Sequence, residues 1–484
     1  MAEGMPCRKV ERDMHEVNEQ VIHELEELVC RVWATPEPGF MEYESSRAHV
    51  EFLRAQGFEV QENVADTVTG YMAVWGKGKP VIALLGAFDA LHGLSQEAFC
   101  THEKKAEGME MGQGCGHHLL GVGAIAAGLM LREIMEKEGL EGQIRIYGCP
   151  AEESGSGKAY MARDGFFDDC DVAITWHPSL YNKVSSGSSQ SCIQSYFRFH
   201  GVASHAAGAP HLGRSALDAA ELMSVGVNYL REHMEDSDRV HYAYTDAGGT
   251  SPNVVQAHSE VRYFIRSATN PQCQKLYERV KKIAQGAALM TETELEILFD
   301  EGLSNTVPNF TLEHVMDGVF RRVGVPVYTE EERAMAQAFK DSYPREQLAG
   351  HLPENVVDKA RLKESILTQP MCDYYVECTP YDICEMGSTD VGDVSWVIPT
   401  VTANVNCYSY GAGGHSWQWV AQGKTSYAMK GMIQAGRIMA ETARELILHP
   451  EVLEEAWKEQ HRRLEGESYQ CLIPPEVKPH SFEK

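Results

Sequence analysis

The stretch Val81-Ile-Ala-Leu-Leu-Gly-Ala-Phe-Asp89 decides the fold class of this 484-residue chain. It is an almost unbroken apolar run, which is typical of a β-strand that is covered on both faces. Similar strand-like runs occupy residues 143–149 and 171–176, and a glycine- and alanine-rich helical pattern occupies residues 119–137. Strands that alternate with helices predict an α/β domain with an open, mostly parallel sheet.

Side chains of the kind that bind metals follow several of these predicted strands. They are, in chain order, Cys115, His117, Glu152, Glu153, His177 and His415. Open α/β sheets bind ligands beyond the carboxyl ends of their strands, so we expect these side chains to converge there. A thiolate and imidazoles suit a borderline-soft metal such as zinc, and one of two adjacent carboxylates can bind a metal while the other moves a proton.

Each of these features alone has an ordinary explanation. A cysteine before a glycine is more often a small core residue, two adjacent glutamates usually belong to a solvated surface, and a single histidine is usually just packed. Convergence at several independent strand ends is hard to explain by packing alone, and it favours a metal site over these alternatives.

A change in the order of elements indicates a second domain. The stretch 184–191 has the serine- and glycine-rich composition of a hinge. The pattern that follows it predicts strand, helix, strand, strand, helix and strand, which is the order of the ferredoxin-like fold. We therefore predict an inserted domain at residues 191–301, and a discontinuous catalytic domain made of residues 1–190 and 302–484.

The rest of the chain is mostly helical in pattern. Apolar residues recur at helical spacing, and the expected helices cover residues 15–34, 43–56, 310–323, 330–341, 425–447 and 450–463. A further strand is predicted at residues 400–407, whereas residues 92–114 are expected to form a long loop. Residues 344–385 show no clear pattern.

Composition and charge exclude several classes of protein. Hydrophobic residues make up 43% of the chain and charged residues 23%, as in ordinary soluble globular proteins. No apolar run approaches the length of a membrane span, and the N-terminus has no apolar signal core. The net charge of −27 argues against nucleic acid or an anionic membrane as a partner. Thirteen cysteines without a regular framework predict reduced thiols and a cytoplasmic location.

A series of short motifs extends over nearly the whole chain. They are Gly-Cys-Gly-His at 114–117, Pro-Ala-Glu-Glu at 150–153, Trp-His-Pro at 176–178, Ser-His-Ala-Ala at 204–207, Pro-His-Leu-Gly-Arg-Ser-Ala-Leu-Asp-Ala at 210–219, Ser-Pro-Asn-Val-Val at 251–255, Gly-Ser-Thr-Asp-Val-Gly-Asp-Val-Ser at 387–395 and Gly-His-Ser-Trp at 414–417. In content and order the chain resembles the aminoacylase-type zinc-dependent metallopeptidase superfamily. It is most similar to the amidohydrolase branch, which holds p-aminobenzoyl-glutamate hydrolases and auxin-conjugate hydrolases.

The resemblance implies two divalent metal ions per chain, zinc or manganese, at one site. The ligands that it implies are Cys115, His117, Glu153, His177 and His415. Cys115 would bridge the two metals, and Glu152 would be the free carboxylate. As general base, Glu152 would take a proton from water and return it to the leaving nitrogen of an amide.

Three further residues have roles that the resemblance implies. His205, in the inserted domain, would donate a hydrogen bond to the tetrahedral oxyanion. Asp89 is expected to orient a metal ligand rather than to bind the metal. His118 departs from the family pattern, because an Asp or Asn usually follows Cys-Gly-His and contributes to the surroundings of the first metal.

The resemblance also implies a substrate class and an assembly. The substrate would be an N-acyl or N-aroyl amino acid with a free carboxylate, and p-aminobenzoyl-glutamate is the nearest example. On a chain of net charge −27 the recognition of an anion must be local, and Arg214, Asn253 and Arg266 are the candidate substrate-binding residues. Local capping by Arg214 and a surface pair at Arg266 are the alternatives. We expect a homodimer through the inserted domain, which serves as lid and dimerisation domain, with the catalytic domains outermost, because that domain ends its sheet in unpaired edges.

Other functions stay open on the sequence alone. A dipeptidase or aminoacylase of the same superfamily would use the same site. A cysteine amidase with Cys115 as nucleophile and His117 as its base would leave the remaining carboxylate and histidines unexplained. A non-catalytic binding or scaffold protein on the same fold would have lost a ligand or the general base, and none is missing.

Overall fold

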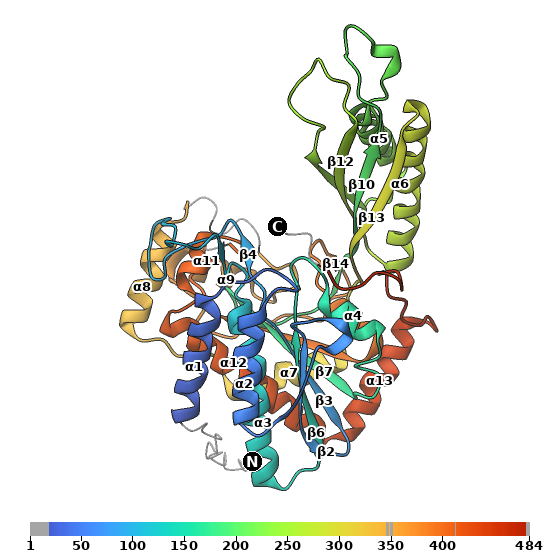
Figure 1. The fold of residues 1–484 in the computed structure, drawn as a ribbon. Helices are drawn as coiled ribbons and strands as arrows, with labels where there is room; N and C mark the ends of the chain where they lie inside the picture. The colour runs from blue at the N-terminus through green and yellow to red at the C-terminus, as the bar shows by residue number, and fades with distance from the viewer. Residues whose placement is uncertain (1–18, 345–347, 349–351, 412, 481–484) are drawn as a thin grey trace, which may run out of the picture.

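The structure of the protein is a computed structural model that describes residues 19–344, 348, 352–411 and 413–480. Two sheets of different size organise this part of the chain (Figure 1). The first predicted helix is present as α1 (Glu19–Ala34), and the remainder of that prediction, residues 15–18, lies outside the described residues.

The larger sheet has seven strands in the order β1-β2-β6-β3-β7-β15-β8. Their bounds are β1 Glu59–Glu62, β2 Tyr71–Lys77, β6 Gly142–Cys149, β3 Val81–Ala87, β7 Val172–Ser179, β15 Thr400–Asn406 and β8 Lys183–Val184. The four central strands β6, β3, β7 and β15 are parallel. The outer strands pair in the antiparallel sense, so the sheet is mixed, and the prediction of a mostly parallel sheet holds only for its centre.

Strand β3 shows why the apolar runs predict this sheet. Ile82 and Leu84 point into one hydrophobic core, whereas Val81, Ala83 and Leu85 point into a second core on the opposite face. Both faces of the strand are therefore buried, and no polar position interrupts the run. The edge strand β1 has the sequence Glu-Val-Gln-Glu and is largely exposed, so it has no comparable apolar signal.

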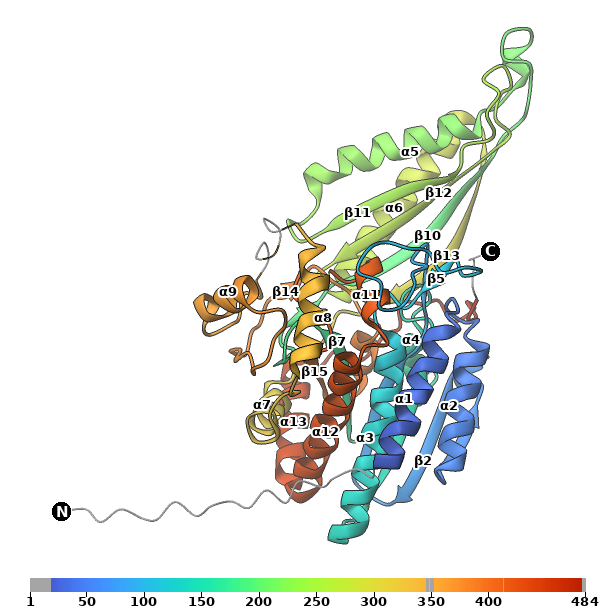
Figure 2. The ribbon, with the colours of Figure 1, turned by 90° about the vertical axis from the view of Figure 1, so that its left-hand side faces the viewer.

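Helices cover both faces of the larger sheet (Figures 1 and 2). The core around Ile82 and Leu84 is shared by α1, α2 (Tyr43–Ala55), α3 (His117–Glu138), α7 (Phe310–Val323) and α12 (Ser426–Leu448). The core on the other face is shared by α4 (Gly157–Arg163) and α10 (Val391–Val397). Helix α13 (Pro450–Leu464) contributes apolar side chains to both cores.

The smaller sheet has the predicted ferredoxin-like topology. Its strands are β10 Ser191–His200, β11 Arg239–Asp246, β12 His258–Ser267 and β13 Glu294–Leu303, in the antiparallel order β11-β12-β10-β13. Helices α5 (Ala216–Leu230) and α6 (Asn270–Thr291) pack against it and share a core separate from those of the larger sheet. The unit extends away from the larger sheet in both views (Figures 1 and 2). The exact domain boundaries stay a prediction.

Several elements lie where the sequence pattern was weak. Helix α8 (Glu330–Asp341) is present as predicted, whereas the unpatterned region after it contains α9 (Lys359–Thr368) and β14 (Cys384–Glu385), and the short α11 (Trp417–Gln422) was not predicted. Strand β14 pairs with β9 (Ser188–Ser189), so the predicted hinge is held by hydrogen bonds. The long loop before Cys115 contains only the short pair β4 (Leu91–His92) and β5 (Met111–Gly112). Short 3₁₀ helices cover Val64–Asp66, Pro210–Leu212 and Arg231–His233.

Helix α3 is the central helix of the larger unit. By length and composition it could cross a membrane, but 89% of its most apolar window is buried inside the protein. A glycine at position 123 lets it approach β7, because a Cβ there would lie 2.4 Å from the indole nitrogen of Trp176. The apolar character of α3 is therefore explained by its position in the core.

Candidate metal centre and active site

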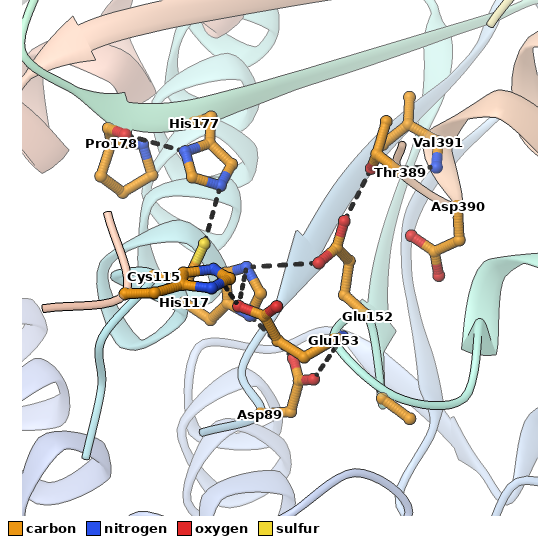
Figure 3. Close-up of polar contacts among 12 residues, drawn as sticks. Asp89, Cys115, His117, Glu152, Glu153, His177, Pro178, Thr389, Asp390 and Val391 are labelled. Carbon is orange, nitrogen blue, oxygen red and sulfur yellow. Dashed lines mark hydrogen bonds and ion pairs between the residues drawn. The ribbon is translucent and has the colours of Figure 1, made fainter. Parts of the chain in front are cut away.

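Cys115 and His117 lie on either side of Gly116 at the start of α3. Gly116 has a φ of 84°, a left-handed conformation that lets the chain turn sharply between the two side chains. A Cβ at this position would lie 2.4 Å from the hydroxyl of Tyr408, so the turn has no room for a larger residue. Both side chains point toward one common centre (Figure 3).

Asp89 sets the orientation of the His117 ring. Its Oδ1 accepts a hydrogen bond from His117 Nδ1 at 2.8 Å, and its Oδ2 accepts the backbone N–H of Glu153 at 2.8 Å. With Nδ1 engaged in this way, His117 Nε2 is turned to the centre. Among the described residues this buried nitrogen has no hydrogen-bond partner, and the nearest carboxylate oxygens, of Glu152 and Glu153, are 3.7 and 4.0 Å away.

His177 is held in a similar way at the carboxyl end of β7. Its Nδ1 donates to the carbonyl oxygen of Pro178 at 2.8 Å, and its Nε2 lies 3.5 Å from Cys115 Sγ. A backbone carbonyl can only accept, so Nδ1 carries the proton and Nε2 faces the centre. The ring thus presents a nitrogen toward the thiol, as a metal-binding histidine does.

A tight turn after β6 aims Glu152 and Glu153 in different directions. The backbone N–H groups of Gly155 and Ser156 both donate to the carbonyl oxygen of Ala151, at 3.0 and 2.7 Å. Ala151 has a φ of 55°, a conformation that is uncommon for a residue with a side chain and is typical of functional sites. From this turn Glu153 extends toward Cys115, whereas Glu152 extends toward the segment before α10 (Figure 3).

His415 approaches the centre from the segment before α11. Its Nε2 lies 3.2 Å from Glu153 Oε1, and its side chain is about half exposed. Possible donor atoms within 4.8 Å of one another form three groups: Cys115 with His117 and His177, Cys115 with Glu153 and His415, and His117 with Glu152 and Glu153. Cys115 therefore belongs to two of the three groups.

The charges of the cluster stabilise one another. Burial and Glu153 act to raise the pKa of the Cys115 thiol, but His117 and His177 outweigh them and lower it to about 6. Burial also opposes the ionised form of Glu153, yet the hydrogen bond from His415 and the charge of His117 lower the pKa of Glu153 to about 2. The same contacts with Cys115 and Glu153 raise the pKa of His415 to about 10.

Glu152 has the opposite character from its neighbour. Burial raises the pKa of Glu152 to about 7, against the charge of His117, which lowers it. A carboxyl group with a pKa near the working pH can both accept and release a proton, which is the property of a general acid–base catalyst. The raised pKa of Glu152 suits a general base, and the lowered pKa of Glu153 suits a metal ligand.

The donor set fits a borderline-soft divalent metal. One thiol, three imidazole nitrogens and one carboxylate converge, and the imidazoles of His117 and His177 each have their outer nitrogen fixed by a second partner. The unpartnered nitrogen of His117 is the sharpest indication, because a buried polar atom without a partner is rare and costly. A metal ion at this position would satisfy it.

Some residues that orient the site were not identified from the sequence. The buried Glu42 accepts the backbone N–H of Ala151 at 2.7 Å and the hydroxyl of Thr69 at 2.6 Å. The hydroxyl of Thr389 donates to Glu152 Oε1 at 2.8 Å. Thr389 belongs to the motif at 387–395, which offered a signal, whereas nothing local marks Glu42.

Three of the predicted site residues lie far from this cluster within one chain. Strand β10 ends at His200, which pairs with His258 at the start of β12, and the segments 201–215 and 247–257 form the free end of the smaller unit (Figure 1). His205 and Asn253 are exposed there. Arg214 is paired with Glu292 at 2.7 Å.

Arg266 and His118 have different surroundings from these. Arg266 is at the opposite end of β12, where its Nη1 donates to the hydroxyl of Ser388 at 2.9 Å, one residue before Thr389. His118 is completely buried, and its Nε2 contacts the carbonyl oxygen of Gly423 at 2.9 Å. The ring of His118 thus contacts the backbone before α12 rather than a candidate ligand.

Comparison with known proteins gives the relationships of the chain. Residues 190–291 match the M20 peptidase dimerisation domain. The chain is 43% identical to one of the subunits of the p-aminobenzoyl-glutamate hydrolase of Escherichia coli strain K12, over 94% of this chain and 95% of that protein. It is 26% identical to the Xaa-Arg dipeptidase of Mus musculus, over 90% of this chain and 88% of that protein.

A solved structure supports the same relationship at the level of the fold. It is a dinuclear metal-binding peptidase of the M20 family from Bacillus subtilis, with a TM-score of 0.52 and 16% identity, and the match covers 88% of this chain and all of that one. The sequence relationship to the hydrolase extends over 94% of this chain. The chain therefore belongs to the M20 family of metal-dependent hydrolases that cleave amide bonds.

Proposed function

We propose that this protein is a metal-dependent amidohydrolase that cleaves the amide bond of an N-acyl or N-aroyl amino acid, with p-aminobenzoyl-glutamate as the first substrate to test. The observation that supports the proposal most strongly is the geometry of the cluster. Glu152, the proposed proton acceptor, lies beside the five proposed ligands. The 43% identity to a p-aminobenzoyl-glutamate hydrolase supports the choice of substrate.

Two divalent metal ions, zinc or manganese, would be held by the groups that share the Cys115 sulfur. The proposed ligands are Cys115, His117, Glu153, His177 and His415. When bound, such ions supply Lewis-acid activation of water and of the scissile carbonyl. The position of Cys115 in two donor groups supports a bridging role for its sulfur, and Asp89 would keep His117 in the binding orientation.

Glu152 would act as the general base of the reaction. It accepts the proton of the attacking water and later transfers it to the leaving nitrogen, so no covalent bond forms between the enzyme and the acyl group. A pKa near 7 suits both steps. This assignment makes a nucleophilic role of Cys115 unnecessary, because the thiol is surrounded by metal-type donors rather than by one catalytic histidine.

Replacing each of the two carboxylates in turn by an amide tests the proposal. Glu152→Gln should retain the metals and the fold but reduce turnover of p-aminobenzoyl-glutamate by ~10² or more, as for a lost general base. Glu153→Gln is the matched variant on the next residue and should lose metal affinity. Metal content measured together with turnover separates the two effects, and the reverse pattern would refute the assignment.

Substrate recognition would fall to the smaller unit. We propose Arg266 as the principal group for the substrate carboxylate, because its contact with Ser388 brings it next to the segment that touches Glu152. Arg214 and Asn253 are proposed as further contacts and His205 as a donor to the oxyanion. Since these three lie at the free end of the unit, their contacts require a closed conformation or a second copy of the chain.

A homodimer would form through the smaller unit. The outer face of α5 exposes Leu222, Val225 and Tyr229, by 36, 50 and 71%, and these positions share one side of the helix. Strand β11 is at the edge of its sheet, pairs only with β12 in the described chain and is mostly exposed. An apolar helix face beside an open strand edge suits pairing with an identical unit.

The free thiols of all described cysteines agree with the proposed cytoplasmic location.

A dipeptidase is the second candidate function. The similarity to the Xaa-Arg dipeptidase supports it, and the same ligands and base would serve. Parallel assays of the metal-loaded protein on p-aminobenzoyl-glutamate and on a dipeptide with C-terminal arginine separate the two. Turnover of the dipeptide alone would replace the first proposal by the second.

A further inference from the structure

The motif at 387–395 reaches the proposed general base through Thr389. The Thr389 hydroxyl donates to Glu152 Oε1 at 2.8 Å, while the other carboxylate oxygen, Oε2, lies 3.7 Å from His117 Nε2. One oxygen of Glu152 is thus held by Thr389, and the other faces His117 among the proposed ligands (Figure 3). A flexible glutamate side chain that is fixed at one oxygen presents the second in a defined direction.

The direction of the Thr389 hydroxyl is itself set by the backbone. The N–H of Val391 points to Thr389 Oγ1 at 3.4 Å, so the oxygen accepts on one side and its proton is directed to the carboxylate on the other (Figure 3). A hydroxyl has one proton to donate and can accept at the same time. The arrangement therefore fits a carboxylate that is ready to accept a proton at its free oxygen.

A buried ion pair fixes the two segments that carry these residues. Lys158 Nζ donates to Asp390 Oδ1 at 2.6 Å, and the backbone N–H of Lys158 donates to Asp390 Oδ2 at 2.9 Å. The two side chains are only 2% and 0% exposed. Lys158 is in α4, directly after the turn of Glu152, and Asp390 is the neighbour of Thr389, so the pair holds one segment against the other.

We propose that Thr389 is a positioning residue that holds Glu152 in the orientation needed for proton transfer, with the Lys158–Asp390 pair fixing the distance between their two segments. This inference rests on the proposed function of Glu152 as general base. Thr389 has no described hydrogen bond to any of the five proposed ligands; its described side-chain hydrogen bonds are with Glu152 and the backbone N–H of Val391. It acts on the reaction through Glu152.

Replacement of Thr389 tests the inference. Thr389→Val keeps the shape of the side chain and removes the hydroxyl, and it should lower kcat about 10- to 100-fold, as for other groups that orient residues of a metal site. KM and metal content should stay close to those of the wild type. Thr389→Ser restores a hydroxyl and should recover most of kcat, which a purely structural role of the methyl group would not do.

A control variant removes a threonine hydroxyl elsewhere in the larger unit. Thr442, in α12, is completely buried and donates to the carbonyl oxygen of Ile438 at 2.8 Å. Thr442→Val should leave kcat unchanged, because this hydroxyl bonds within α12 and not to the cluster. Equal kcat in Thr389→Val and wild type would overturn the inference, as would a loss of kcat that Thr389→Ser does not recover.

The outcome for Glu152 separates this inference from the proposed function. If Glu152→Gln reduces turnover but Thr389→Val does not, the general base stands and the positioning role is wrong. If Glu152→Gln itself retains full turnover, the proposed function fails and the positioning role fails with it. A loss of metal from Thr389→Val, measured without any activity assay, would also overturn the inference, because it would mean that Thr389 supports the ligands instead.

Discussion

Glu301 provides a test of how a buried carboxyl group at the junction of the two units changes stability with pH. It lies near the end of β13, where the chain returns to the larger unit, and it is 4% exposed. Its Oε1 accepts from the hydroxyl of Ser156 at 3.1 Å and its Oε2 accepts from Gln194 Nε2 at 3.0 Å. Burial, followed by the charge of Asp300, raises the pKa of Glu301 from 4.5 to about 8.

The sign of the effect follows from the two pKa values. Below pH 4.5 the carboxyl group is protonated in both the folded and the unfolded chain, so it does not affect stability. Between pH 4.5 and 8 the unfolded chain releases the proton and the folded chain keeps it, so the free energy of unfolding falls as the pH rises. At 1.36 kcal/mol for each pH unit, the difference between 4.5 and about 8 sets an upper limit of about 4–5 kcal/mol.

Glu301→Gln removes the titration but keeps the shape of the side chain. An amide can donate to Ser156 and accept from Gln194, so both contacts persist. The variant should gain stability relative to the wild type as the pH rises from 4.5 to 8, and the two proteins should converge below pH 4.5. Urea unfolding of the metal-loaded protein at several pH values measures this difference. Glu294→Gln, at an exposed position of the same strand, is the control, and identical pH dependence of all three proteins would refute the reasoning.

Further predictions concern the metals, the substrate and the assembly. Elemental analysis should find two divalent ions per chain, and a chelator should abolish turnover; full activity without metal would refute the metal site. Arg266→Ala should raise KM for p-aminobenzoyl-glutamate, at a cost of ~2–4 kcal/mol, and should reduce discrimination against the substrate carboxamide; an unchanged KM would exclude Arg266 from carboxylate binding. Val225→Glu combined with Tyr229→Glu should convert a dimer to a monomer in light scattering, whereas a surviving dimer would place the interface elsewhere.

The parts of the fold that the sequence predicts are those with strong local patterns. Strand β3 and helix α3 are largely buried on all sides, so their apolar runs are long and unambiguous. The antiparallel edge was not predicted, because β1 is exposed and polar and pairs only on one side. Helix α9 was missed for a similar reason: only Leu362, Ser365 and Ile366 are buried in it, so its apolar face is narrow.

In the candidate site, too, the residues that local motifs mark could be predicted, whereas the partners that orient them could not. Glu152, Glu153 and His177 stand at strand ends, which can be recognised within a few residues of sequence, whereas Cys115 and His117 stand at the start of α3 and His415 just before α11. The partners that orient them come from far along the chain: Asp89 is 28 residues from His117, and Thr389 is 237 residues from Glu152. Pairings of this kind depend on the complete topology. For His205, Arg214 and Asn253 the motif alone gave no indication that they lie at the free end of a separate unit.

The acidic surroundings of the cluster connect its function with the stability of the fold. Burial raises the pKa of Glu42 to about 8 and that of Glu152 to about 7, so the larger unit carries several carboxyl groups in an environment that opposes their ionisation. Asp89 and Glu153 add further carboxylates nearby, and Asp89 accepts a hydrogen bond from the backbone N–H of Glu153. Such a site gains stability from a bound divalent cation, because a ligand that binds only the folded chain stabilises it by about 2.7 kcal/mol at 100 times its Kd. The groups whose ionisation burial opposes, Glu42 and Glu152, thus lie beside the proposed ligands rather than among them, and Glu152 keeps a pKa suited to moving protons.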